Sequence, residues 1–542
     1  MVFSFSEKPK IKRKDWIKII VCSIPIFCIG LYKGGAAHLA VYLMGLYAII
    51  LLSVFLFINQ ESRIKKNRFL LPLAIFTGAS LTVTLLSPAL LSSMEGFLEY
   101  FAYLIFFTAL LLIKPDKKVL LLSVFIFCLS ELVVCFFQLG SGRVSGTYEY
   151  ANFFVFPLIF GFLYSFKLGN KTIRYSLMIL FFVFSVLTGS RIVLVLILVL
   201  PFFLFERKIF ALIAPILIGL VLLVPNPIKK RVIGKVEVYS LQRPNLWKQA
   251  IRTGLDRPLS GWGLRSYKKA SLRYNFPVEG KYLRKARIAH NEFLQFFAEG
   301  GIILSLAYLY LFFVFFMNFK KIGKFERILI TVIFIHSLFD NVLYLPANFL
   351  IFIVILFSAD DSTGEYKVNF SLPFKVIFIL ISFIYLIPLS AYVLEKKGEI
   401  EFNSQKYGKA IYYLSLAESL WPLPSYSTSL ATVNEQLFHE TGLLGYLSFA
   451  FYLHSRAMES NPIDWELPFK KYEFFKRYKQ NIYNKDAAET AESFLLEAIE
   501  LNPKNRILYE TLMRDYKERG MEEKAKEVEH KTDSIFPLQL TN

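Results

Sequence analysis

The sequence contains few charged residues and few cysteines for its length. Charged residues make up 19% of its 542 residues, against about 25% in an ordinary soluble domain. Tryptophan (5), histidine (6) and cysteine (4) are also scarce, whereas phenylalanine occurs 56 times. Hydrophobic residues reach 55%, and the mean hydropathy is +0.47. This composition excludes a single soluble enzyme, a disordered chain and a collagen-like chain, and it predicts an integral membrane protein.

The four cysteines, Cys22, Cys28, Cys128 and Cys135, lie inside apolar runs without C-x-x-C spacing. Cysteines in such runs behave as small buried hydrophobic residues. The spacing therefore indicates neither a disulfide framework nor a zinc site. The sequence also lacks the G-x-x-x-x-G-K signature of a phosphate-binding loop.

Apolar stretches recur along the first 394 residues. A helix needs about 17–25 predominantly apolar residues to cross a bilayer. The stretches lie near 17–31, 39–58, 69–90, 97–113, 119–138, 151–166, 175–189, 191–205, 209–224, 293–317, 327–340, 342–357 and 372–394. They predict an all-α fold, a polytopic membrane helix bundle of about 12 or 13 spans.

Basic residues occur in every second connection between these stretches. They cluster before the first stretch and at 63–68, 114–118, 167–174, 206–208 and 320–327, whereas short loops such as 87–96 are nearly uncharged. Because Lys and Arg in short loops resist translocation, the N-terminus is predicted to be cytoplasmic. The same alternation places segment 225–292 and the tail after residue 394 outside the cytoplasm.

The net charge of +20 is concentrated in one segment. Residues 225–290 contain 16 lysines and arginines but three acidic residues, which leaves +13, whereas residues 395–542 carry a net −4. A basic loop on the outer face attracts an anionic partner. Lipid headgroups, a pyrophosphate-linked lipid and an acidic polysaccharide all fit, whereas no nucleic-acid module accompanies the loop, so no nucleic-acid partner is expected.

Four motifs lie in and around this loop. They are Arg143-Val-Ser-Gly-Thr-Tyr-Glu-Tyr-Ala-Asn152, Thr188-Gly-Ser-Arg191, Arg243-Pro-Asn-Leu-Trp247 with the following Gly261-Trp-Gly263, and Ala289-His290-Asn291. In this order and topology they resemble the O-antigen ligase and polymerase family of bacterial membrane glycosyltransferases. The resemblance covers roughly residues 140–345.

The arginines of these motifs are candidates for binding phosphate. Arg191 begins a predicted span, where an arginine is costly unless it is paired or lines a wet cavity. The planar fork of its N–H donors suits phosphate oxygens. Arg143 and Arg243 offer the same chemistry, and Asn152 is a hydrogen-bonding neighbour at the membrane boundary. The alternative for each arginine is an interfacial side chain that reaches the lipid headgroups.

His290 ends the basic loop directly before a predicted span. A neutral imidazole can take a proton from an acceptor hydroxyl, and the surrounding cations favour the neutral form. The alternative is an ordinary loop histidine. Asn291 is a further candidate for substrate binding. For His336 and Asp340, one turn apart in the eleventh predicted span, we predict interhelical hydrogen bonding rather than support of the site.

The tail has a different composition from the membrane part. Segments 407–422, 450–462 and 491–503 each place alanines in an amphipathic helix that ends near a proline. They resemble degenerate tetratricopeptide repeats, whose helix pairs stack to bury their apolar faces. The predicted divisions are therefore 1–224 (spans one to nine), 225–292 (external loop), 293–394 (spans ten to thirteen) and 395–542 (a helical-repeat domain that offers a surface for a protein partner or a glycan).

The resemblance implies a function at the bacterial inner membrane, in contact with membrane lipids. Its donor would be a glycan linked to undecaprenyl pyrophosphate, held by Arg143, Arg191 and Arg243, and its base would be His290 in an inverting transfer without metal or other cofactor. Lipid A core is the favoured acceptor; a growing glycan (polymerase) and a protein (oligosaccharyltransferase) stay open. The non-enzymatic alternative is a carrier or flippase of lipid-linked glycans.

We predict that a reporter enzyme that works only outside the cytoplasm is active when it is fused after residue 400. Thirteen spans from a cytoplasmic N-terminus would deliver that point to the outer side. Reporter activity in intact cells measures the outcome. An inactive reporter would place the repeats in the cytoplasm and separate them from the chemistry.

Overall fold

The computed structural model describes residues 13–31, 38–58, 61–140, 142–204, 207–233, 243–278, 281–282, 287–369, 372–481 and 487–536. These residues form α-helices, short 3₁₀ turns and two small antiparallel sheets, β1 (Glu61–Lys65) with β4 (Glu365–Asn369) and β2 (Pro277–Val278) with β3 (Lys281–Tyr282). The predicted all-α fold is confirmed.

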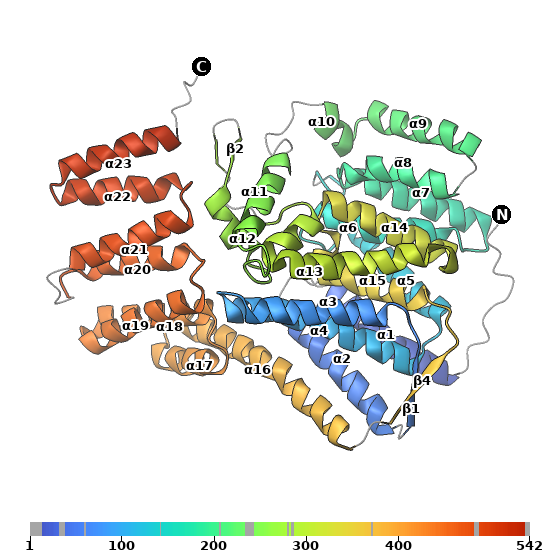
Figure 1. Cartoon of the computed structure of the whole chain (residues 1–542), viewed down its shortest axis with the longest axis horizontal. Helices are drawn as coiled ribbons and strands as arrows, with labels where there is room; N and C mark the ends of the chain where they lie inside the picture. The colour runs from blue at the N-terminus through green and yellow to red at the C-terminus, as the bar shows by residue number, and fades with distance from the viewer. Residues whose placement is uncertain are drawn as a thin grey trace.

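A helix forms over each apolar stretch that the sequence predicts as a span (Figure 1). The helices are α1 (Arg13–Gly30), α2 (His38–Ile58), α3 (Leu70–Leu85), α4 (Leu90–Ile113), α5 (Lys117–Phe137), α6 (Ala151–Ser165), α7 (Lys171–Leu187), α8 (Ile192–Leu204), α9 (Arg207–Leu223), α13 (Glu292–Met317), α14 (Lys324–Phe339), α15 (Pro346–Ser358) and α16 (Leu372–Asn403). Within the described residues, four helices are long and apolar enough to cross a bilayer: α2, α4, α5 and α13. The total of 12 or 13 spans stays a prediction.

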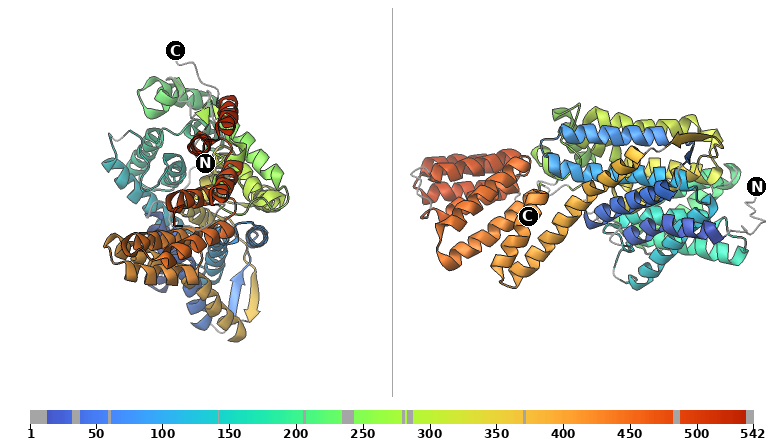
Figure 2. Two further views of the ribbon diagram at one scale, coloured as in Figure 1. Left: turned by 90° about the vertical axis from the view of Figure 1, so that its left-hand side faces the viewer. Right: turned by 90° about the horizontal axis from the view of Figure 1, so that it is seen from below.

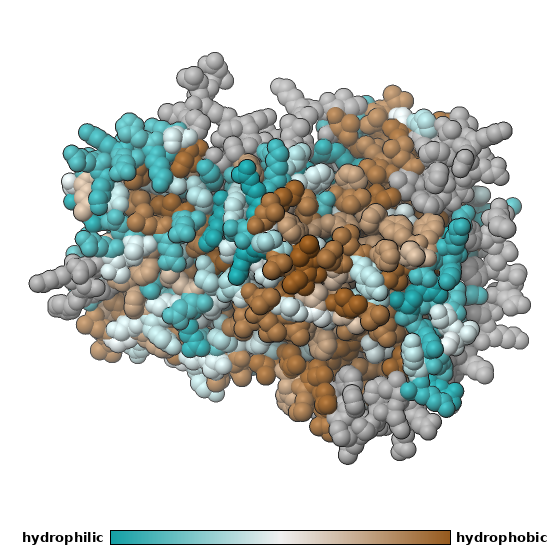
Figure 3. Space-filling view, viewed as in Figure 1, coloured by the Kyte–Doolittle hydropathy of each residue, from teal (hydrophilic) through white to brown (hydrophobic). Residues whose placement is uncertain are grey.

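Aromatic and aliphatic side chains fill the interior of the bundle. Every residue of α15 is buried, and the helix lies in the middle of the membrane part (Figure 1). Its Phe349 stacks on Tyr103 of α4 with ring centroids 4.2 Å apart. Figure 3 shows hydrophobic residues over the membrane helices and hydrophilic residues over α22 and α23 at the upper left. A helix bundle with an apolar interior and an apolar outer surface is typical of a membrane protein.

The connections meet at two ends of the bundle, in the groups that the charge alternation predicts. At one end, Lys117 reaches Asp361 with an Nζ–Oδ1 distance of 2.7 Å, and Arg68 donates to Asn318 Oδ1 at 3.1 Å. At the other end, Arg143 contacts the turn at Thr188. Loops predicted to share a side of the membrane therefore contact each other.

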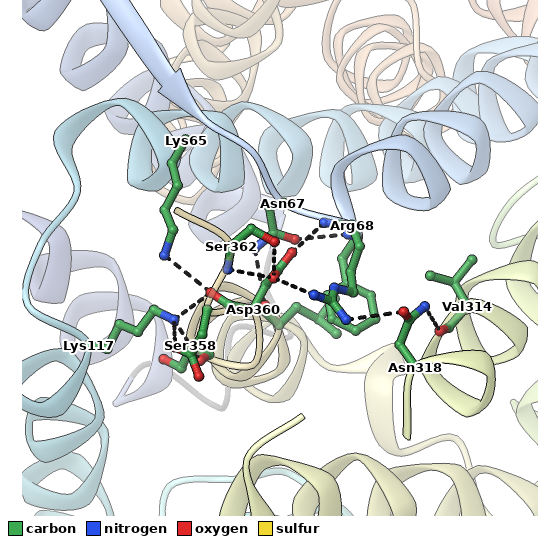
Figure 4. Close-up of polar contacts among 12 residues, drawn as sticks. Lys65, Asn67, Arg68, Lys117, Val314, Asn318, Ser358, Asp360 and Ser362 are labelled. Carbon is green, nitrogen blue, oxygen red and sulfur yellow. Dashed lines mark hydrogen bonds and ion pairs between the residues drawn. The ribbon is translucent and has the colours of Figure 1, made fainter. Parts of the chain in front are cut away.

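At the first of these two ends, Asp360 lies at the centre of a cluster of polar contacts (Figure 4). Its buried carboxylate accepts from the Arg68 backbone N–H at 2.7 Å and pairs with the Arg68 guanidinium at 3.0 Å, while Ser362 donates its hydroxyl at 2.6 Å. The Asp360 carbonyl accepts from the ammonium groups of Lys65 and Lys117. These contacts join the connections that follow α2, α4 and α15.

The basic segment between α9 and α13 folds onto α13. It contains α10 (Pro227–Ile233), α11 (Arg243–Asp256), α12 (Tyr267–Ala270) and the 3₁₀ turn η3 (Ser271–Tyr274). The chain turns at Gly261 and Gly263, and both residues have positive φ. A Cβ at Gly261 would lie 2.4 Å from the Glu299 carbonyl carbon, so only glycine allows this approach.

The tail consists of antiparallel helices that stack beside α11 and α12 (Figure 1). They are α17 (Tyr407–Leu420), α18 (Pro424–Thr441), α19 (Leu444–Ser460), α20 (Glu466–Tyr478), α21 (Ala487–Leu501), α22 (Arg506–Glu518) and α23 (Glu522–Ile535). The helix α16 runs without interruption from the membrane part to this stack (Figure 2), so the predicted boundary at 394/395 lies inside a helix. That the stack consists of tetratricopeptide repeats stays a prediction.

We predict that Asp360→Asn lowers the thermal midpoint of the purified protein. Loss of the carboxylate leaves the Arg68 guanidinium without its buried counter-charge, and removal of one partner of a buried ion pair costs about 3–5 kcal/mol. The neighbouring Asp361, whose side chain is 80% exposed, supplies the control Asp361→Asn. Equal midpoints for the two variants in detergent would contradict a stabilising role of the Asp360 cluster.

Candidate functional site

Three predicted site residues contact one buried carboxylate, that of Asp340 after α14. Its Oδ1 lies 2.9 Å from His290 Nδ1. Its Oδ2 lies 3.2 Å from the Arg243 guanidinium and accepts from Asn152 Nδ2 at 3.0 Å. Because these residues come from three separate segments of the chain, the Asp340 carboxylate connects the loop, α6 and α14 at one point.

Arg143 extends this cluster to the second predicted motif. Its Nη2 donates to Asn152 Oδ1 at 2.9 Å, and its Nε donates to the Thr188 carbonyl at 2.6 Å. Gly189, with φ +65°, allows this contact, since a Cβ there would lie 3.1 Å from Arg143 Nε. The half-buried Arg191 follows in the same turn, directly before α8. All four motifs therefore meet at one end of the bundle.

The backbone of His290 has φ +52°, in the left-handed region that non-glycine residues rarely adopt. Its carbonyl accepts from Trp247 Nε1 at 3.2 Å, so Trp247 holds the backbone of His290. The preceding Ala289 N–H donates to Gln295 Oε1 at 2.8 Å. Such conformations persist where surrounding contacts hold them, and they cluster at functional sites.

Asn291 holds His290 from the other side. Its Oδ1 accepts from the Leu294 N–H at 3.0 Å and so caps α13, while its Nδ2 donates to the Leu338 carbonyl at 2.9 Å. Both ends of the amide therefore bond to the protein. The two bonds tie the start of α13 to the end of α14. That Asn291 binds substrate stays a prediction.

The contact with Asp340 also selects the tautomer of His290. A carboxylate at Nδ1 favours the proton on that nitrogen, so the lone pair of the neutral ring lies on Nε2. A histidine in this arrangement can accept a proton at Nε2, and the carboxylate stabilises the imidazolium that results.

A cavity of about 1170 Å³ lies beside this cluster. Asn152, His290 and Asp340 are on its wall, and Arg243 contacts the cavity-lining Asp340. The tail also contributes to the wall, through residues of 423–426 at the start of α18 and of 461–466 between α19 and the start of α20. The cavity thus lies between the membrane part and the tail, and it exceeds the roughly 300–1,000 Å³ of a typical small-molecule pocket.

Residues 176–309 match the family model described as O-antigen ligase. This segment is similar to an O-antigen ligase domain. The match includes Arg191, Arg243 and His290, whereas Arg143, Asn152 and Asp340 lie outside the matched range. The resemblance predicted from the four motifs is confirmed, and the match supports a membrane glycosyltransferase activity of the ligase or polymerase type.

No curated protein matches the chain. Among solved structures, one match is described as "Crystal structure of MamA protein". It is 14% identical, covers 30% of this chain and 87% of that chain, and has a TM-score of 0.23.

The contacts of Asp340 go beyond its predicted role. Interhelical hydrogen bonding was the predicted role, but the Asp340 side chain contacts three predicted site residues. The signal was present, because an acidic residue at the end of an apolar stretch is a functional candidate by default. The prediction for His336 is wrong: within the described residues, neither of its buried ring nitrogens has a hydrogen-bond partner.

We predict that Asp340→Asn lowers glycan transfer by about 10²-fold or more, within the range of general acid–base effects. The amide cannot stabilise the imidazolium of His290 and leaves the Arg243 charge unpaired. Because the two residues act as a unit, His290→Ala combined with Asp340→Asn should lower the rate little further. Surface glycan in cells is the measurement.

The control for this prediction is Asp533→Asn, at an exposed position in α23. It should leave transfer unchanged at an equal amount of membrane-inserted protein. If the rate reduction in the double variant equals the product of the two single reductions, His290 and Asp340 do not act jointly.

Proposed function

We propose that the protein transfers a glycan from a lipid pyrophosphate carrier to a hydroxyl acceptor on the outer side of the bacterial inner membrane. The observation that carries the proposal is the Asp340 cluster, which joins a histidine base to arginines at the edge of a large cavity. The ligase-domain match supports the same reaction class.

The donor that fits the arginines is undecaprenyl-pyrophosphate-linked glycan. A pyrophosphate carries concentrated negative charge, and the segment around Arg243 carries a net charge of +13. A guanidinium has five N–H donors, more than the bond from Arg243 to Asp340 requires. Arg191 lies in the turn at 188–191, and Arg143 contacts that turn at Thr188. Both would bind the same leaving group.

The reaction proceeds in one inverting step. His290 Nε2 accepts the proton of the acceptor hydroxyl while the oxygen forms a bond to the anomeric carbon of the donor sugar. The bond from that carbon to the pyrophosphate oxygen breaks, and its electron pair remains on the pyrophosphate. The arginines stabilise the negative charge that develops there, so the transfer requires no metal.

Lipid A core is the acceptor that we favour, which makes the protein a ligase. A growing repeat unit or a protein hydroxyl would use the same base and the same leaving group. A carrier or flippase of lipid-linked glycans would use the arginines but not His290. This difference separates the enzymatic proposal from its non-enzymatic alternative.

We predict that His290→Ala lowers glycan attachment by about 10²- to 10⁴-fold, the usual contribution of a general base. Arg191→Ala should lower it by about 10²-fold, since it removes one donor to the leaving group. The measurement is the ratio of glycan-bearing to bare acceptor in cells that make surface polysaccharide, with each variant at equal abundance.

The matched control is Arg252→Ala, an exposed arginine of α11, the helix that also carries Arg243. It should leave attachment within about twofold of the parent protein. Unchanged attachment in both His290→Ala and Arg191→Ala would sink the catalytic proposal. Loss in Arg191→Ala alone would favour a carrier.

A further inference from the structure

A second histidine–carboxylate pair lines the same cavity as His290 and Asp340. His38 Nδ1, at the start of α2, lies 3.2 Å from Glu95 Oε2 in the first turns of α4. The His38 side chain is 51% exposed, whereas the Glu95 side chain is 9% exposed. Both residues lie on the cavity wall and outside the four motifs and the matched ligase range.

Several polar contacts fix this pair in place. The Tyr42 hydroxyl donates to Glu95 Oε1, so both oxygens of the carboxylate have partners. One turn further along α4, Glu99 pairs with Arg265 and accepts from the Tyr103 hydroxyl at 2.6 Å. Because the carboxylate favours the proton on Nδ1 of His38, Nε2 carries the lone pair of the neutral ring.

The tail covers the cavity on the side of this pair. Lys269 joins the loop segment to the tail, with Nζ 2.7 Å from Asp464 Oδ1 and 3.3 Å from Glu466 Oε2. Tyr426 of α18 is buried and lines the cavity. Burial, together with the nearby charge of Glu95, raises the pKa of Tyr426 above its ordinary value, so its hydroxyl remains a donor at neutral pH.

The charges in this part of the cavity differ from those near His290. Arg243 contacts the cluster at His290, whereas Arg265 beside Glu95 is paired with Glu99. Besides Glu149 and Asp340, the cavity wall carries the carboxylates of Glu95, Glu395, Asp464 and Glu466; Lys269 pairs with Asp464 and Glu466, and Lys396 with Glu395. Glu95, by contrast, contacts an imidazole and a phenol rather than a permanent cation, so its negative charge would repel a pyrophosphate. The pair therefore suits an uncharged ligand rather than the donor.

The groups on this wall match the hydroxyls of a sugar. A carboxylate and an imidazole nitrogen accept hydrogen bonds from hydroxyls, and the phenol of Tyr426 donates one. The rings of Tyr392 and Trp465 add flat amphipathic surface to the same cavity. The volume of about 1170 Å³ leaves room for more than one sugar ring beside His290.

We propose that His38 and Glu95, together with Tyr426 of the tail, form a subsite that binds the hydroxyls of an acceptor glycan. This inference rests on the proposed function and adds the class of the acceptor: a neutral glycan that extends from His290 toward the tail. The subsite positions the acceptor and takes no part in the bond-forming step.

The test is a transfer assay with purified protein, lipid-pyrophosphate-linked glycan as donor and core glycolipid from cells that lack this protein as acceptor. His38→Gln and Glu95→Gln should each raise the acceptor KM by about 10-fold or more, as expected for a lost hydrogen bond to a charged or polar partner. The kcat value and the donor KM should stay within about twofold of the parent protein.

Two further variants separate this subsite from a structural role. Tyr426→Phe removes a single hydroxyl and should raise the acceptor KM without a change in the thermal midpoint. His530→Gln changes an exposed histidine of α23 and should alter neither constant.

The outcomes also separate this inference from the proposed function. A parental acceptor KM in His38→Gln, Glu95→Gln and Tyr426→Phe overturns the subsite, provided that His290→Ala is inactive in the same assay. An active His290→Ala overturns the proposed function itself. Transfer to an unstructured serine-rich peptide, with its KM raised by the same variants, would contradict the glycan class of the acceptor.

Discussion

The buried carboxylate of Asp340 is the contact on which the site depends. A charge without water around it is costly unless it is paired and hydrogen-bonded. His290, Arg243 and Asn152 supply these partners, and they come from the loop and from α6. The same contacts orient the imidazole and bring the arginine segments toward one cavity, so the stability of the bundle end and the geometry of the site have a common origin.

Similar pairing occurs throughout the described part of the bundle. At the opposite end, Asp360 joins three connections through Arg68, Lys65 and Lys117. At the cavity, Glu95 and Glu99 have partners in His38, Tyr42 and Arg265. Since a membrane interior offers no water to compensate a lone charge, acidic residues in apolar helices mark places where separate segments must meet.

The helix α16 connects the membrane part, which holds the candidate site, to the tail. It continues without a break from the apolar bundle into the helical stack, and its Glu395 lines the cavity together with residues of the tail. A continuous helix transmits position better than a flexible linker does. The tail is therefore part of the cavity wall, outside the matched range of residues 176–309.

The sequence by itself determined the positions of the apolar helices, the grouping of their connections and the arginine and histidine motifs, because hydropathy and charge are local properties. It did not determine that Asp340 joins those motifs, or that Glu95 and Tyr426 share a cavity with His290. These contacts join residues up to hundreds of positions apart, and they depend on how α4, α14 and α18 pack. Side-chain spacing within one helix cannot encode which distant carboxylate a histidine meets; only tertiary packing decides it.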